Sequence, residues 1–339
     1  MGDNRFDELL PMTIELGVSA RQFAMLHGVR DALMQIDRST KAGPDLTTFD
    51  LLVFTVGEGL RLEPFKDHLL AMNHMDSLPV TLANFGSGQG SQPLTSVAQY
   101  QAYHKRIAAL PQWIDAAIAN MREGMKQNIV LPRALVVSLL PQIKKLAAAT
   151  PGASDFNAAR RLPDAFAAAD KAALKGVFFN TVAGQVLPSV RKLARFLEAD
   201  YLPAARATAG WGALPGRSQW YRAYVAAHTT TALAPDEIHR IGLAEVARIQ
   251  AELAKLGPKL GYTGAPPGLP RWLSAQPQYR PFSTDEQVLQ AYRDLNVRIA
   301  PKLPQLLATL PEAPLEIRAE PALSRETASD HYTLAAADG

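Results

Sequence analysis

The chain has 339 residues, 47% of them hydrophobic and 20% charged, and its 35 Lys and Arg residues nearly balance its 32 Asp and Glu residues. This composition is typical of a globular protein with an ample core, and the positive charge is too dispersed to indicate nucleic-acid binding. The absence of cysteine excludes disulfides and thiolate catalysis, and it leaves His, Asp and Glu as the side chains that could bind zinc.

A helical period of hydrophobic residues runs through most of the chain. The expected helices, in chain order, cover residues 47–62, 93–110, 111–128 and 132–149, then two or three segments within 170–208, then 235–256 and 285–310. Thr95 or Ser96 is expected to cap one helix, Pro111 to open the next and Asn128 to close it. No apolar run approaches the ~20 residues of a membrane span, and the charged start "MGDNRFDELLP" does not predict a signal peptide.

One short segment near the end has strand character. In "PLEIRAEP", Leu315, Ile317 and Ala319 alternate with charged residues. The sequence has no internal repeat and no obvious linker, so residues 1–339 are expected to form one mainly α assembly, with a small β element near the C-terminal end and no internal domain boundary.

The histidines do not have the spacing of a zinc site. A His-Glu-x-x-His motif would place two imidazoles one helical turn apart. No two of the seven histidines are separated by three or four residues, and His68 and His74 are six apart, on different faces of a helix. No metal site formed by this chain alone is expected.

Other catalytic motifs are also missing. "NFGSGQGSQPL" contains Gly86, Gly88 and Gly90, but it has neither dinucleotide-binding nor phosphate-loop spacing, so it is expected to be a loop between helices that could approach a ligand. There is no Gly-x-Ser-x-Gly elbow, and the pair Asp330–His331 is too common to indicate a site.

The stretch "HTTTALAPDEIHRIGLAEV" at 228–246 combines a helix start with candidate functional groups. Pro235 suits the first helical position, whereas Ala234 cannot supply a capping oxygen, which costs roughly 1 kcal/mol. Glu245 falls within the apolar stripe of the helix, where a carboxylate is costly unless it is paired. Either an Arg or a backbone amide holds a buried Glu245, or the carboxylate orients a neighbouring site.

The same stretch carries a family resemblance. "YRAYVAAHTTTALAPDEIHRIGLAEVARIQAEL" resembles the characteristic segment of the bacterial family called domain of unknown function 885. Its matching positions are Tyr221 or Tyr224, Thr229, Thr230, Leu233, Pro235 to His239, Gly242, Leu243, Glu245, Val246, Arg248 and Ile249. "GDNRFDELLP", "HMDSLPVTLANFGSGQGSQPL", "HKRIAALPQW", "MREGM" and "VLPRALV" resemble earlier segments of the family, so the resemblance covers nearly the whole chain.

The resemblance implies a zinc metallopeptidase of the helical, carboxypeptidase-like kind, often exported or a lipoprotein. The family's metal motif, His-Glu-x-x-Pro-Gly-His, is absent here, so no zinc ligand or catalytic residue is carried over. The chain ends in an Asp-Gly of the kind that, in the family, precedes a strand leading into the catalytic half. We therefore expect an N-terminal portion that is inactive alone, with zinc belonging to the full-length protein.

This portion is expected to contribute cleft walls and peptide contacts. The candidate substrate-binding residues are Thr229, Thr230, Glu245, His331 and Tyr332. Three alternatives remain open: a non-catalytic helical peptide-binding or scaffold protein, a hydrolase using an unrecognised Asp/His/Ser constellation, and a truncated product without function.

Overall fold

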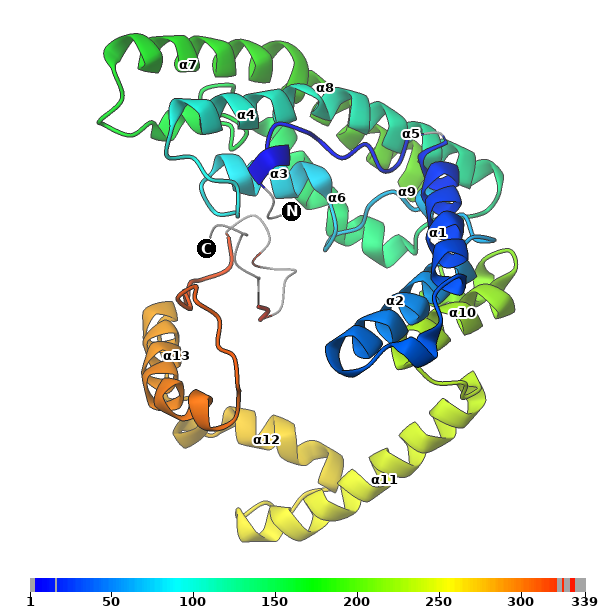
Figure 1. Ribbon diagram of the computed structural model, residues 1–339. Helices are drawn as coiled ribbons and strands as arrows, with labels where there is room; N and C mark the ends of the chain where they lie inside the picture. Colours follow the sequence, from blue (N-terminus) through cyan, green and yellow to red (C-terminus); the bar gives the residue numbers. More distant parts are fainter. Residues whose placement is uncertain (1–3, 16, 322–324, 326–329, 333–339) are drawn as a thin grey trace. The chain divides into compact units, whose positions relative to one another are not determined.

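The computed structural model describes residues 4–15, 17–321, 325 and 330–332. Its residues form two compact units, unit 1 of residues Met1–Tyr224 with Glu320–Gly339 and unit 2 of residues Val225–Ala319. The prediction of a mainly α fold is confirmed, because helices account for most of both units (Figure 1). The one β-bridge among the described residues joins Pro132 to Arg206.

Unit 1 is built on two helical rods that run in parallel. One rod consists of α4 (Val97–Ala108) and α5 (Leu110–Lys126), and the other contains α7 (Ala168–Thr181) and α8 (Leu187–Arg195). Helix α4 packs on α7 and α5 packs on α8 (Figure 1). Helix α6 (Arg133–Ala148) packs on α8, and α3 (Leu78–Gly86) packs on α6.

Local signals in the sequence set the ends of the first rod. The hydroxyl of Ser96 accepts from the backbone N–H of Gln99, and the Gln99 side chain accepts from the N–H of Ser96, so the predicted cap is a reciprocal capping box. Asn128 takes a left-handed backbone with φ of 57° directly after α5, where an asparagine is well tolerated. Both predictions are confirmed.

The second rod is continuous because π-helical turns join its parts. A π segment at Val182–Val186 links α7 to α8, and another at Phe196–Tyr201 links α8 to α9 (Leu202–Ala204). Pro188 and Pro203 stand just after these turns. A proline lacks the N–H that an α-helix would use and clashes with the preceding turn, so a local change of helical geometry is the expected adjustment.

The core of unit 1 lies between the rods and α6. Its centre contains fully buried Tyr103, Ile107, Phe178 and Leu193. A second, smaller cluster joins Leu69, Ile129, Leu214 and Trp220, with Phe65, Trp211 and Tyr224 packed against it.

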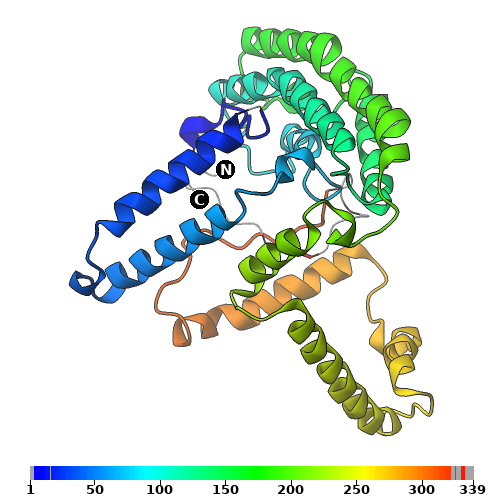
Figure 2. The ribbon, with the colours of Figure 1, turned by 90° about the vertical axis from the view of Figure 1, so that its right-hand side faces the viewer.

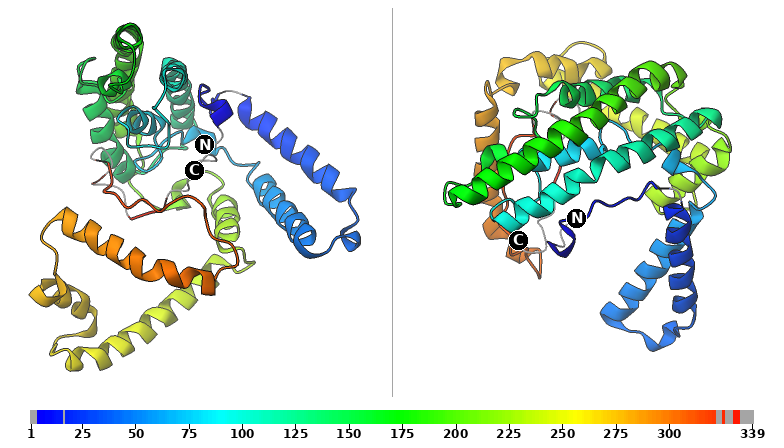
Figure 3. Two further views of the ribbon diagram at one scale, coloured as in Figure 1. Left: turned by 60° about the vertical axis from the view of Figure 1, so that its left-hand side comes forward. Right: turned by 90° about the horizontal axis from the view of Figure 1, so that it is seen from above.

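Helices α1 (Val18–Met34) and α2 (Gly43–Arg61) form a hairpin and lie side by side (Figures 2 and 3). Helix α1 was not predicted, because its hydrophobic residues have little periodicity. Helix α2 begins four residues before the predicted start at 47, because Pro44 already suits a first turn. Short 3-10 helices in unit 1 lie at Asn4–Phe6, Arg38–Thr40, Asp67–Leu69, Ala158–Arg161 and Trp211–Ala213.

Unit 2 contains α11 (Pro235–Lys259), α12 (Leu269–Ala275) and α13 (Asp285–Ile299), and α10 (Arg217–Thr229) crosses the boundary between the units. Helix α13 starts at a capping box between Thr284 and Gln287 and continues as a 3-10 helix over Ala300–Gln305, which together match most of the predicted segment 285–310. Further 3-10 helices lie at Pro266–Gly268 and Pro277–Tyr279.

The predicted β element is not found. Residues 314–321 are described without strand structure, and Leu315 is exposed. Alternation alone does not make a strand, because its N–H and C=O groups need a neighbouring strand, and the described part of the chain offers none there. The expected Asp-Gly at 338–339 lies outside the described residues.

Candidate functional site

The titratable residues do not gather into a metal site. Among the described residues, no group of three or more His, Asp and Glu side chains is placed to hold a metal ion. His68 and His74 each bury an Nδ1 atom that has no hydrogen-bond partner, but neither belongs to such a group. The described residues therefore do not provide a site for the zinc that the family resemblance implies.

Thr229 and Thr230 end helix α10 with an unusual backbone. The Thr229 hydroxyl donates to the carbonyl of Val225 at 2.8 Å, and the N–H of Thr230 donates to the carbonyl of Ala226 at 2.8 Å. Thr230 has φ of 54°, in the left-handed region that β-branched residues rarely occupy. Such a conformation costs about 1–2 kcal/mol. Strain of this kind often accompanies a functional site.

Glu245 on α11 is paired but not buried. Its carboxylate accepts from Arg248 Nε at 2.8 Å, and its side chain is 54% exposed. The prediction that an arginine could hold Glu245 matches this contact, whereas the expected burial is not found because the stripe around it is exposed as well. At the start of the helix, Glu237 accepts from the N–H of Ala234 at 2.9 Å, which replaces part of the missing cap.

His331 and Tyr332 belong to the C-terminal segment of unit 1. His331 Nδ1 lies 3.8 Å from the carboxylate of Glu320, and both His331 and Tyr332 are exposed. Thr229, Thr230 and Glu245 belong to unit 2. The five predicted substrate-binding residues thus belong to two different units. Their role in binding a substrate stays a prediction.

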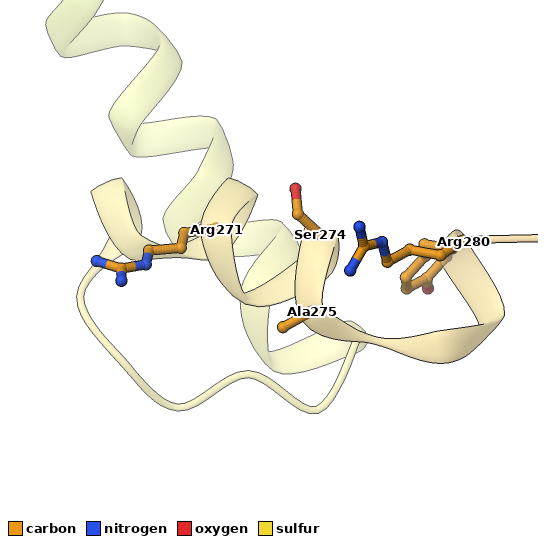
Figure 4. A pocket seen from close by; sticks show the side chains of 5 residues that line it. Arg271, Ser274, Ala275 and Arg280 are labelled. Carbon is orange, nitrogen blue, oxygen red and sulfur yellow. The ribbon is translucent and has the colours of Figure 1, made fainter. Parts of the chain in front are cut away.

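The sequence analysis missed a hollow in unit 2. An open depression of about 550 Å³ is lined by Arg271, Ser274, Ala275, Tyr279 and Arg280, from α12 and the 3-10 helix after it (Figure 4). Arg280 extends back toward Ser274, whereas Arg271 lies one turn earlier and points away from it (Figure 4).

The two arginines of this hollow have no acidic partner. No side-chain hydrogen bond or ion pair within the described residues engages either guanidinium, so both are available to an anion. A signal in the sequence could have revealed them. No Asp or Glu occurs from Leu253 to Thr284, a stretch that contains Arg271, Arg280 and two lysines.

Comparisons with known proteins identify the family. The model of the family described as "Bacterial protein of unknown function (DUF885)" matches residues 1–339. The chain belongs to this family. No curated protein matches it. Within the described residues, no helix is long and apolar enough to cross a membrane.

A solved structure shares the fold of this DUF885 chain. "The putative lipoprotein from Colwellia psychrerythraea" superposes with a TM-score of 0.77 at 18% sequence identity, over 93% of this chain and 56% of the other. The chain thus spans little more than half the length of that protein.

Two of the DUF885 family segments meet at a buried arginine. Arg106, from "HKRIAALPQW", donates to the carbonyls of Phe6 and Leu9 at 2.9 and 3.0 Å, and both belong to "GDNRFDELLP". It also donates to Gln92, and the Asp7 carboxylate lies 3.6 Å away. Burial lowers the pKa of Arg106, and the Asp7 charge opposes that shift. This arginine anchors the N-terminal segment, so the motif has a structural role.

Of the two tyrosines that could match the family pattern, Tyr224 is packed against other side chains and Tyr221 is exposed. Tyr224 packs against Trp211 with ring centroids 4.8 Å apart, and burial, followed by the nearby Asp67 charge, raises the pKa of its hydroxyl. Tyr224 therefore fixes the first turns of α10 to the second core cluster of unit 1.

The glycine loop is held by packing. A Cβ atom on Gly86 would lie 2.3 Å from the carbonyl oxygen of Asp155, and one on Gly90 would lie 2.1 Å from the ring of Phe85. Gly88 has φ of 75°. The loop thus needs glycine for its own fold, whatever it approaches.

Proposed function

We propose that residues 1–339 are the helical, non-metal-binding portion of a peptidase-like hydrolase, and that further polypeptide supplies its catalytic groups. The observation that carries this proposal is that the chain covers 56% of a solved member of the same fold. The absence of a metal-binding group among the described residues agrees with such a division. Export, as a lipoprotein or into the periplasm, belongs to the same proposal and is supported by the name of the solved neighbour.

In this proposal the chain contributes contacts to a peptide. Thr229, Thr230 and Glu245 of unit 2, with His331 and Tyr332 of unit 1, offer hydroxyl, carboxylate and imidazole groups that are exposed. The arginine hollow suits the free carboxylate of a peptide, because a guanidinium forms strong charge-assisted hydrogen bonds with carboxylates.

Two preparations test the proposal. The 339-residue chain, purified and supplied with zinc, is expected to cleave no peptide, whereas the protein isolated from its source cells is expected to show peptidase activity that a chelator removes. Cleavage by the 339-residue chain that survives chelation would overturn the proposal.

The second candidate is a non-catalytic helical peptide-binding protein. The observation that favours it is the open hollow with two available guanidiniums, which needs no metal to bind a carboxylate.

Peptide binding without metal can be tested on the two arginines directly. Replacing both Arg271 and Arg280 with Gln is expected to weaken binding of a peptide with a free C-terminal carboxylate by about tenfold, corresponding to ~1.4 kcal/mol. The same peptide with an amidated C-terminus serves as the control and is expected to bind both proteins equally. Equal loss for both peptides would show that the arginines do not read the carboxylate.

A further inference from the structure

Unit 2 has almost no core. Of its residues 225–319, all of which are described, only Gly257 and Leu269 are buried. Gly257 lies near the end of α11 against Tyr262, whose ring packs on Trp272, and Leu269 is the first residue of α12. The rest of α11 and all of α13 have no packed interior of their own.

Helix α11 carries an apolar stripe that Glu245 interrupts. At about 100° per residue, one face collects Ile238, Ile241, Ile249, Leu253 and Leu256. Ile241, Ile249 and Leu256 are 54%, 47% and 42% exposed. Glu245 lies inside this stripe, and its ion pair with Arg248 reaches toward the edge.

Helix α13 repeats the pattern. Val288, Tyr292, Leu295 and Ile299 follow one another at spacings of four, three and four residues, and all four are exposed. This spacing places them on one face of the helix, as in helices that pack along their length against another helix.

Two such stripes are costly to leave in water. Burying a Leu, Ile or Val side chain contributes about 1.5–3 kcal/mol, and helices owe most of their stability to the packing of an apolar face. Large exposed apolar surfaces on a protein are typical of interaction sites.

The solved neighbour contains polypeptide that residues 1–339 do not match. Of the Colwellia psychrerythraea chain, 56% is matched here, so a large part of that protein has no counterpart in residues 1–339. We propose that the apolar stripes of α11 and α13 are the docking surface for the counterpart of that unmatched part, a polypeptide outside these 339 residues. This inference rests on the proposed function in one respect, that the working protein contains such polypeptide.

The pairing within the stripe defines the chemistry of the occupant. The docked polypeptide presents an apolar face to Ile241, Ile249 and Leu256. At Glu245 it either leaves the ion pair with Arg248 in place or supplies a hydrogen-bond donor of its own. A buried carboxylate without either would cost several kcal/mol.

Site-specific crosslinking tests the surface and its occupant. A photoreactive benzoylphenylalanine is introduced at Ile249 in the protein made by its source cells, and the crosslinked peptides are identified by mass spectrometry. The matched control carries the same group at Ala247, which is exposed and faces away from the stripe, about 160° around the helix from Ile249. We expect the group at residue 249 to form crosslinks to peptides outside residues 1–339, and the group at residue 247 to form none.

Other products overturn the proposal. A crosslink from 249 to residues 1–224 would show that unit 1 covers the stripe, and one to a second copy of residues 1–339 would make the surface a homodimer contact. Equal or absent crosslinking at 249 and 247 would show that no polypeptide docks there.

A second readout covers the case in which the bulky group disturbs folding. Ile249→Cys introduces a thiol into a segment that has no other cysteine, and its labelling by a maleimide is expected to be at least ~10-fold slower than that of Ala247→Cys, because a covered site reacts only when it opens. Equal labelling rates count against docking. Neither readout depends on catalysis, so an inactive protein with a covered stripe would refute the proposed function and leave the docking surface standing.

Discussion

Two buried polar side chains of unit 1, Tyr103 and Arg106, donate hydrogen bonds to backbone carbonyls. The hydroxyl of fully buried Tyr103 donates to the carbonyl of Leu82 at 2.9 Å, and burial raises its pKa strongly. Arg106 donates to two carbonyls of the N-terminal segment. Such contacts tie segments distant in sequence to the core, since losing one partner would leave a buried polar group unpaired.

His104 makes the stability of unit 1 depend on pH. Its Nε2 lies 2.7 Å from the Thr181 hydroxyl, and burial lowers its pKa below the ordinary 6.5. The unfolded chain therefore binds the proton more readily. The stabilisation is fully present above pH 6.5 and is lost as the pH falls from 6.5 toward the lower pKa of the folded protein.

Denaturant titrations between pH 5 and 7.5 would measure this dependence. The free energy of unfolding of the wild type is expected to fall with acid more steeply than that of His104→Gln, which keeps a polar group but does not titrate. Parallel curves for the two proteins would show that His104 does not contribute, since all other histidines are common to both.

The left-handed backbone of Thr230 is expected to lower the free energy of unfolding. Thr230→Gly removes the Cβ atom from a left-handed backbone and should raise the free energy of unfolding by about 1 kcal/mol, whereas Thr231→Gly, at a residue with ordinary φ, should not. Chemical denaturation of both variants checks this. Destabilisation by Thr230→Gly would mean instead that the side chain makes a contact worth more than the strain.

At the scale of elements, close helix contacts depend on glycine. Gly86 ends α3, and a Cβ atom there would lie 2.4 Å from the Tyr103 hydroxyl as well as against Asp155. Gly86→Ala is expected to lower the free energy of unfolding by about 1–3 kcal/mol. The control is Gly176→Ala in α7, where a Cβ atom meets nothing within 4 Å and the higher helix propensity of alanine should stabilise by about 0.5–1 kcal/mol. A neutral Gly86→Ala would show that α3 can move away from Asp155.

Helices with local start and stop signals could be predicted from the sequence. The cap at Ser96, the closure at Asn128 and the start at Pro235 depend on short-range hydrogen bonds, so the residues themselves indicate them. Helix α1 could not be predicted in this way, because its hydrophobic residues have little period. The prediction of a strand at 314–321 was wrong, because a strand depends on a partner strand that the local sequence does not reveal.

The candidate sites also depend on contacts that the local sequence does not reveal. The exposure of Glu245 depends on what packs over α11, and no local pattern reports that. The arginine hollow depends on a short helix and the turn after it, and no helix was predicted between residues 256 and 285.

At the scale of the whole molecule, the two units differ in how complete they are. Unit 1 encloses a core around Tyr103 and Phe178, whereas only Gly257 and Leu269 are buried in unit 2. A family match over all 339 residues, together with a solved chain of the same fold only 56% covered, is what a portion of a larger protein would give. This difference in coverage supports the proposal that these residues work as part of a longer polypeptide.

The most direct test is the intact mass of the protein in the cells that make it, measured after purification through an antibody against unit 1. We predict a single polypeptide with a mass well above the 36.8 kDa of these residues, and with further sequence joined to them. A polypeptide of 36.8 kDa as the form present in those cells would contradict it.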